Sequence, residues 1–311
     1  MSVISNTWFD DVPVLGALAP DKALAKLREL GEYEFANQIE GKLRDASFSV
    51  DAFGSIHLLP DKAWQHTEHT FGYIKPTPAR QTKPIPIQHA DNILADESLK
   101  NSRIKITLDR LRVADYPGGG IHLVLFDFFA RNQVSAHVEN LHFNATYRVR
   151  EGEHAAIVGY PIFVGLNVGS EGIEFGYFTV NVKNDNDRAL LGFLDSDVFK
   201  AGLQLVSTIQ PAIAPLSGMA LGLTKAIAAR RRNVPVEDVR MGLDFSSIPF
   251  RARLAEGSYV AVQIPEMSKT VWDWAEWVYE PKRSQIVSST DQNRLIPYNY
   301  IVFGVSRYGG D

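Results

Sequence analysis

A two-residue alternation of apolar and polar side chains runs through most of the chain from residue 103 onward. In "RIKITLDRLRV" the apolar Ile104, Ile106 and Leu108 alternate with polar neighbours. Because successive side chains of a strand point to opposite faces of a sheet, this pattern predicts strands with one buried face. Turn sequences such as "YPGGG" and "GSEG" separate the segments, and few helical stretches intervene. The sequence therefore predicts a mainly β protein that folds as an antiparallel β-sandwich.

The expected sandwich domain spans residues 101–311. About eight segments in it have the length and residue types of strands. They are residues 103–113, 121–129, 134–149, 155–168, 172–182, 242–254, 258–264 and 299–308.

Residues 198–232 interrupt the strands with a stretch rich in alanine, leucine and other small residues. Between residues 201 and 229 the only charged residue is Lys225. Pro211 and Pro215 lie in the middle, and proline breaks a continuous helix. We expect a helical insertion of two pieces, which either lies buried against the sandwich or exposes one face to a membrane.

The first part of the chain, residues 1–74, is expected to be a helical segment. Within residues 21–46, Phe35, Ile39 and Leu43 recur at intervals of four, which places them on one face of a helix. This pattern predicts a short helical hairpin with one apolar face. That face either docks on the body of the same chain or receives a partner.

A proline-rich segment, residues 75–100, follows as the expected linker. Its first part, residues 75–89, contains four prolines, which oppose both helix and central strand. Three basic residues without an acidic residue between them make it a candidate for cleavage: Lys75, Arg80 and Lys83. We expect an extended, solvated tether, or alternatively a regulatory cleavage site.

Composition excludes several classes of function. The 311 residues include no cysteine, so disulfides, thiolate metal sites and cysteine nucleophiles are excluded. A net charge of -4 argues against a dedicated nucleic-acid binder, which usually carries a basic excess. The N-terminus lacks the features of a signal peptide, and no apolar run is long enough for a spanning helix. These observations predict a cytoplasmic protein.

The sequence contains none of the motifs that are typical of common catalytic or nucleotide-binding sites. There is no G-x-S-x-G elbow, no P-loop, and no G-x-G-x-x-G between a strand and a helix. The glycines of "YPGGG" lead into a strand and not into a helix. We therefore favour a protein that is not an enzyme. A hydrolase whose site is not visible as a motif remains an alternative.

Acidic residues at two expected loop ends are candidates for a metal site. Asp185 and Asp187 follow a strand, and Asp115 lies in the turn "ADYPGGG". Calcium is bound by six to eight oxygen atoms, several of them from carboxylates, and these three residues could supply some. The alternative is that asparagine and aspartate form turns here by bonding their own backbone.

In these segments the chain resembles C2 domains, a β-sandwich family that often binds membranes. The resemblance covers about residues 103–200. "IKITLDRLRVADYPGGGIHLVLFDF" is similar to the family's first strand, loop and second strand, and "FTVNVKNDNDRALLGFLD" to its strand with an Asp-x-Asp loop. The resemblance implies a membrane-binding sandwich and, in calcium-binding members, a calcium site. This chain lacks the second aspartate of the first loop, so we expect no cofactor, with calcium at Asp115, Asp185 and Asp187 as the alternative.

Two further groups of residues are candidates for a membrane or partner surface. Arg230, Arg231 and Arg232 directly follow the stretch whose only charged residue is Lys225, and there they could contact anionic headgroups. The segment "TVWDWAEWVYEP" brings together Trp272, Trp274 and Trp277, which either line a binding surface or pack in the core.

The sequence as a whole predicts a binding protein that acts at an anionic membrane surface or on a partner protein through a C2-like sandwich. An alternative is a regulated effector, switched at residues 75–89, that engages a membrane through residues 198–232. No nucleic-acid partner is expected.

Overall fold

The computed structural model describes residues 7–44, 62–78, 80–134, 137–191, 202–205, 213–266, 268 and 271–309. Strands dominate these residues, so the prediction of a mainly β protein is confirmed. Neighbouring strands run antiparallel, with two exceptions at sheet edges. The short strand β9 (Leu203–Gln204) runs parallel to β7 (Tyr160–Asn167), and β11 (Ala252–Arg253) runs parallel to β10 (Val234–Asp244). Helices are also present, as a hairpin near the N-terminus and between strands. In the expected insertion, residues 198–232, the described part contains the helix α5 (Ile213–Ala228) and the short strand Leu203–Gln204, while residues 198–201 and 206–212 lie outside the described residues.

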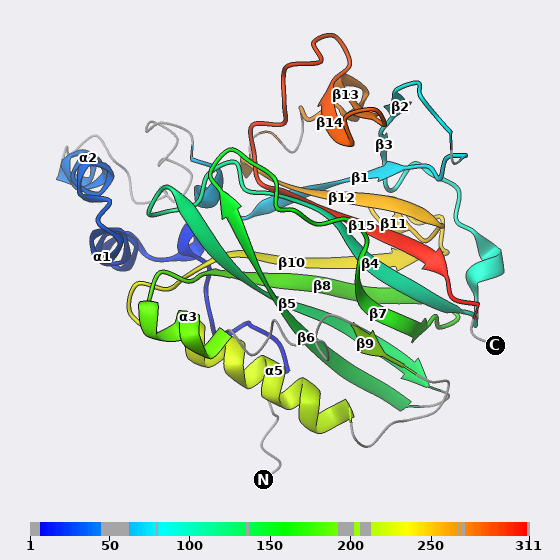
Figure 1. The fold of residues 1–311 in the computed structure, drawn as a ribbon, viewed down its shortest axis with the longest axis horizontal. Coiled ribbons are helices and arrows are strands. Elements are labelled where there is room, and N and C mark those ends of the chain that lie inside the picture. Colours follow the sequence, from blue (N-terminus) through cyan, green and yellow to red (C-terminus); the bar gives the residue numbers. More distant parts are fainter. Residues whose placement is uncertain are drawn as a thin grey trace.

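Two large sheets form the body of the protein (Figure 1). The five-stranded sheet has the order β11 (Ala252–Arg253), β10 (Val234–Asp244), β8 (Gly172–Asn181), β5 (Ile121–Val134) and β6 (His137–Arg150). The seven-stranded sheet has the order β3 (Gln88–His89), β1 (Glu68–Ile74), β12 (Gly257–Ile264), β15 (Tyr300–Arg307), β4 (Arg103–Arg112), β7 (Tyr160–Asn167) and β9 (Leu203–Gln204).

The inner faces of these two sheets share one hydrophobic core. Phe303 of β15 contacts Phe128 of β5 and Phe175 of β8, with ring centroids 6.3 and 5.3 Å apart. The alternating Ile104, Ile106 and Leu108 are fully buried in the same cluster, as their two-residue spacing predicts.

Each sheet is covered on its outer face by a further layer (Figure 1). Helix α5 (Ile213–Ala228) packs on β5, β6 and β8 of the five-stranded sheet, together with the N-terminal residues Trp8 and Phe9. A small sheet covers the seven-stranded one and has the order β14 (Gln285–Ser288), β13 (Trp277–Glu280) and β2 (Ile85–Pro86). Helix α3 (Asp185–Leu191) and the short helices η1 (Leu15–Ala17), η3 (Ala63–Gln65), η4 (Glu97–Leu99) and η7 (Trp274–Glu276) lie in the connections.

The N-terminal hairpin consists of α1 (Pro20–Leu30) and α2 (Tyr33–Arg44). Gly31 joins them with a φ of 86°, a left-handed conformation that glycine adopts without a steric cost. Phe35 and Ile39 are buried, and Phe35 contacts Trp64 edge to face at 5.3 Å. The apolar face of the hairpin therefore docks on the body of the same chain.

The predicted boundaries of the N-terminal segment and of the linker are wrong. Residues 68–74 are not helical but form β1, which lies inside the seven-stranded sheet and pairs with β12 along its whole length. Ile85 and Ile87 are buried, and β2 pairs with β13. The first part of the expected linker, which includes the exposed Lys75, Arg80 and Lys83, lies open to solvent, whereas the later part packs buried side chains against the sheets. Sequence patterns miss this because both pairings join segments about 190 residues apart in the chain.

Limited trypsin digestion is expected to cut first after Arg80. This residue is exposed, and exposed loop segments are nicked before packed ones. Lys75 and Lys83 are each followed by proline, which hinders trypsin. Mass spectrometry of the first fragments checks this result. A first cut within residues 103–182, most of which lie in the paired strands of the two large sheets, would contradict it.

Candidate functional site

The three aspartates proposed as calcium ligands do not form one site. Asp185 and Asp187 lie in the first turn of α3 and not in a loop, where their charges favour the helix. Asp187 is fully buried and accepts hydrogen bonds from the side chains of Arg230 and Asn233. Its carboxylate therefore already has charged and polar partners within the protein.

Asp115 lies elsewhere, in an ion pair with Lys62 at 3.3 Å. Burial raises the pKa of Asp115 to about 6, although Lys62 opposes the shift. Among the residues that the structure describes, no group of three or more histidines, aspartates and glutamates is arranged to hold a metal ion. Within the described residues the three aspartates therefore do not share one cation site, and two of them start a helix that sequence alternation did not reveal.

The three tryptophans lie between the small sheet and the seven-stranded sheet, and not on an open surface. Trp274 and Trp277 are buried, and Trp272 stacks on Trp277 with ring centroids 5.8 Å apart. The Trp274 indole donates a hydrogen bond to the hydroxyl of Thr70 on β1. The structure therefore supports core packing, which is one of the two alternatives that the sequence left open.

Helix α5 has an unusual distribution of side chains. Its inward face includes the polar Ser217 and Thr224, both buried against β5 and β6. Its outward face carries no charged side chain over three turns, and the residues exposed there are Ala214, Pro215, Leu216, Gly218, Met219 and Gly222. Leu216 is 53% exposed and Met219 is 70% exposed. A surface helix normally buries its apolar side chains and exposes charged or polar ones. The outward face of α5 is an exception, because it exposes apolar side chains.

The predicted arginine cluster lies at the C-terminal end of α5, where the structure assigns its members different roles. Arg230 is paired with the buried Asp187. Arg231 is 86% exposed and lies 3.4 Å from Glu29 of α1. Arg232 is also exposed. The uncharged outward face of α5 thus ends beside two arginines that reach solvent.

A buried polar network holds α5 to the sheet. Asp127 of β5 is fully buried and accepts hydrogen bonds from Asn144 of β6 and Thr224 of α5, at 3.2 and 3.0 Å. His142 Nδ1 lies 2.7 Å from the Asp127 carboxylate, and its Nε2 lies 2.8 Å from the carbonyl oxygen of Thr7. Burial alone would lower the pKa of His142, but Asp127 and the Thr7 carbonyl outweigh it and raise that pKa.

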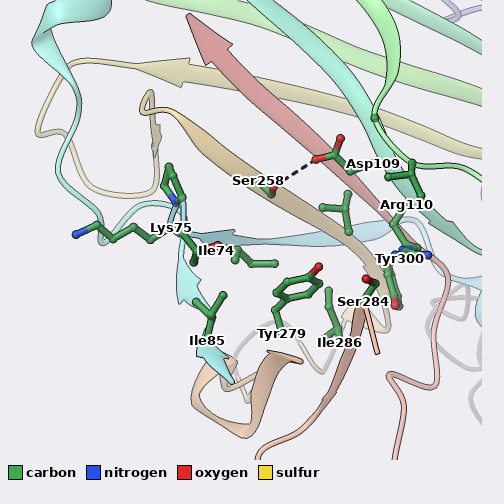
Figure 2. Close-up of a pocket in the computed structure, with 15 residues that line it drawn as sticks. Ile74, Lys75, Ile85, Asp109, Arg110, Ser258, Tyr279, Ser284, Ile286 and Tyr300 are labelled. Carbon is green, nitrogen blue, oxygen red and sulfur yellow. Dashed lines mark hydrogen bonds between the residues drawn. The ribbon is translucent and has the colours of Figure 1, made fainter. Parts of the chain in front are cut away.

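A pocket of about 400 Å³ opens between the seven-stranded sheet and the small sheet (Figure 2). Its floor comes from β1, β4, β12 and β15, one wall comes from β2, β13 and β14, and residues 75–77 and 158–159 form the rim. Apolar side chains cover most of its lining, including Ile74, Ile85, Ile286 and Val302. Asp109, Arg110, Ser258 and Tyr279 add polar groups.

A β-bulge in β4 places two charged side chains on the pocket side of the sheet. Leu108 pairs with Phe303 and Arg110 with Val302, so that Asp109 is the extra residue of the bulge. Leu108 and Leu111 both face the core, while Asp109 and Arg110 between them line the pocket. Bulges redirect side chains in this way and occur often beside functional sites.

The exposed Lys75 lies at the rim of the pocket, and the two charged groups on β4, Asp109 and Arg110, differ in their hydrogen-bond partners. Asp109 accepts hydrogen bonds from the hydroxyls of Thr107, at 2.7 Å, and Ser258, at 3.3 Å. Burial raises the pKa of Asp109, although these hydroxyls and nearby basic residues oppose the shift. Arg110 is half-buried, and within the described part of the chain no hydrogen bond engages its guanidinium, although its charge acts on the neighbouring Asp109 and opposes the rise of the Asp109 pKa.

Comparison with protein-family models, with curated proteins and with solved structures gives no match to this chain. Within the described residues no helix is both long enough and apolar enough to cross a membrane. The functional proposals below therefore rest on the chain's own residues.

Two of these features were missed in the sequence. The three-residue step from Leu108 to Leu111 breaks the two-residue period, and this step was a readable signal of the bulge. His142 and its network gave no such signal, because the helix that buries it lies more than 70 residues further along the chain.

Proposed function

We propose that the protein binds anionic membrane surfaces through the outward face of α5. The observation that carries this proposal is the combination on one helix of an uncharged, apolar outward face and two solvent-exposed arginines at its end. Apolar side chains favour the boundary between headgroups and acyl chains, and each basic residue near an anionic surface contributes about 1 kcal/mol. In this proposal α5 lies in the plane of the membrane surface.

The C2-like character of residues 103–200 belongs to the same proposal. These residues supply strands to both large sheets, namely β4 and β7 to one and β5, β6 and β8 to the other. Membrane binding by this chain would differ from that of calcium-dependent C2 domains, because it would use α5 and not a calcium site at the loops. A partner protein on the same face of α5 is the outcome that the experiment below distinguishes.

Replacing both exposed apolar side chains, in a Leu216→Glu/Met219→Glu variant, is expected to weaken binding to anionic vesicles by about 100-fold. Full burial of each such side chain stabilises by about 1.5–3 kcal/mol, so losing two costs at least two factors of ten. Co-sedimentation with phosphatidylcholine vesicles that do or do not contain phosphatidylserine measures the effect. Leu94→Glu is the matched control, since Leu94 is 91% exposed and lies outside α5.

The arginines are tested by an Arg231→Gln/Arg232→Gln variant, which leaves the pair between Arg230 and Asp187 intact. At about 1 kcal/mol each, the two changes are expected to weaken binding about 30-fold, and added salt should reduce wild-type binding similarly. If the wild-type protein does not sediment with anionic vesicles at low salt, the membrane proposal fails and a protein partner on α5 becomes the leading hypothesis.

A further inference from the structure

We propose that the pocket between the seven-stranded sheet and the small sheet binds a small organic anion, with a carboxylate on an apolar body. The carboxylate would meet Arg110, and the apolar body would lie between the two sheets. This inference concerns a different face of the molecule from α5 and does not depend on membrane binding.

The guanidinium of Arg110, which no hydrogen bond engages within the described residues, is the first observation behind this inference. The β4 bulge turns this side chain out of the core and into the pocket, where it is half-buried. Removing a charged group partly from water costs free energy unless a partner compensates it. Arginine also presents a planar fork of donors that matches a carboxylate. An anion is therefore the ligand chemistry that completes this site.

The lining of the pocket is the second observation. Away from Arg110, Ile74 and Ile85 form an apolar wall beside the exposed Lys75 of the rim, and the half-buried Tyr279 faces the same space (Figure 2). The volume of about 400 Å³ lies in the range of small-molecule sites. A largely apolar cavity with a few fixed polar groups is the usual form of such a site.

The neighbouring Asp109 does not fill the role of partner to Arg110. Its two oxygens accept hydrogen bonds from Thr107 and Ser258, and Figure 2 shows the bond to Ser258 directed away from Arg110. Gly304 on β15 allows this arrangement, because a Cβ there would lie 2.6 Å from the Asp109 carboxylate and 2.5 Å from the Thr107 hydroxyl. The carboxylate is thus hydrogen-bonded by neutral donors. The charge of Arg110 acts on it without a hydrogen bond, so the N–H donors of the guanidinium remain available.

A matched series of three probes tests the charge of the ligand: phenylbutyrate, phenylbutanol and phenylbutylamine. Isothermal titration calorimetry is expected to show that the acid binds at least about tenfold more tightly than the alcohol or the amine. Arg110→Gln should remove this preference, whereas Arg148→Gln, an exposed arginine on the other large sheet, should keep it. Thermal unfolding of each variant confirms that it is folded.

Val158 offers a second test that does not disturb the core, because it lines the pocket yet is 85% exposed. Val158→Lys is expected to strengthen binding of the acid about threefold and Val158→Glu to weaken it by a similar factor, as a nearby charge in water predicts. The proposal is overturned if the acid does not bind, if it binds no better than the alcohol or the amine, or if Arg110→Gln behaves as Arg148→Gln does.

Discussion

Replacement of Asp127 by alanine is expected to lower the free energy of unfolding by about 3–5 kcal/mol, the usual cost of breaking a buried charged pair. Asp127 is fully buried and accepts hydrogen bonds from Asn144 and Thr224, in addition to its contact with His142. Alanine leaves these groups without their acceptor. Urea unfolding followed by circular dichroism measures the loss.

Asp127→Asn is the matched control, because it keeps the shape of the side chain and removes its charge. The pH dependence of the free energy of unfolding separates the contribution of the Asp127 charge from that of the shape of its side chain. Because the folded-state pKa of His142 is raised, its stabilisation is fully present below the unfolded value of about 6.5 and is lost as pH rises through the folded value. Wild-type stability should therefore fall across this window, and the Asn variant should show less of this fall. Equal pH profiles would contradict the role given to the ion pair.

Trp274→Ala is expected to lower the free energy of unfolding by about 3–5 kcal/mol, as large-to-small changes of buried aromatic residues do. Trp274 is 3% exposed and fills the space between the small sheet and the seven-stranded sheet. It packs so closely on β1 that a Cβ at Gly72 would lie 2.8 Å from its ring. Chemical denaturation measures this loss.

The comparison variant for this position is Val271→Ala, since Val271 is 75% exposed nearby and should change stability by less than about 0.5 kcal/mol. At temperatures where Trp274→Ala remains folded, its sedimentation with anionic vesicles should match that of the wild type. If Trp274→Ala kept its stability but lost vesicle binding, the result would support a membrane-binding surface at the tryptophans.

Local patterns in the sequence were sufficient for the elements that depend on near neighbours. The alternation of Ile104, Ile106 and Leu108 predicted a strand with one buried face, and the four-residue spacing of Phe35 and Ile39 predicted a helix. The structure contains both, because side-chain periodicity directly reflects which face of an element is buried. The missing charges of residues 213–224 were equally plain in the sequence, although the sequence left open which face of that helix would be buried.

Only the tertiary structure decided how distant segments meet. Arg230 was grouped with its two neighbours as a surface cluster, yet it pairs with Asp187. For the tryptophans the sequence left open a surface or the core, and the packing of the small sheet on β1 decided between them. The pocket likewise joins two groups of strands that lie far apart along the chain. One group is β1, β2 and β4, and the other is β12, β13, β14 and β15. Sheet pairing and ion pairs of this kind depend on which segments become neighbours after folding. A single sequence carries no periodic signal for such contacts, because their partners are separated by long and variable stretches of chain.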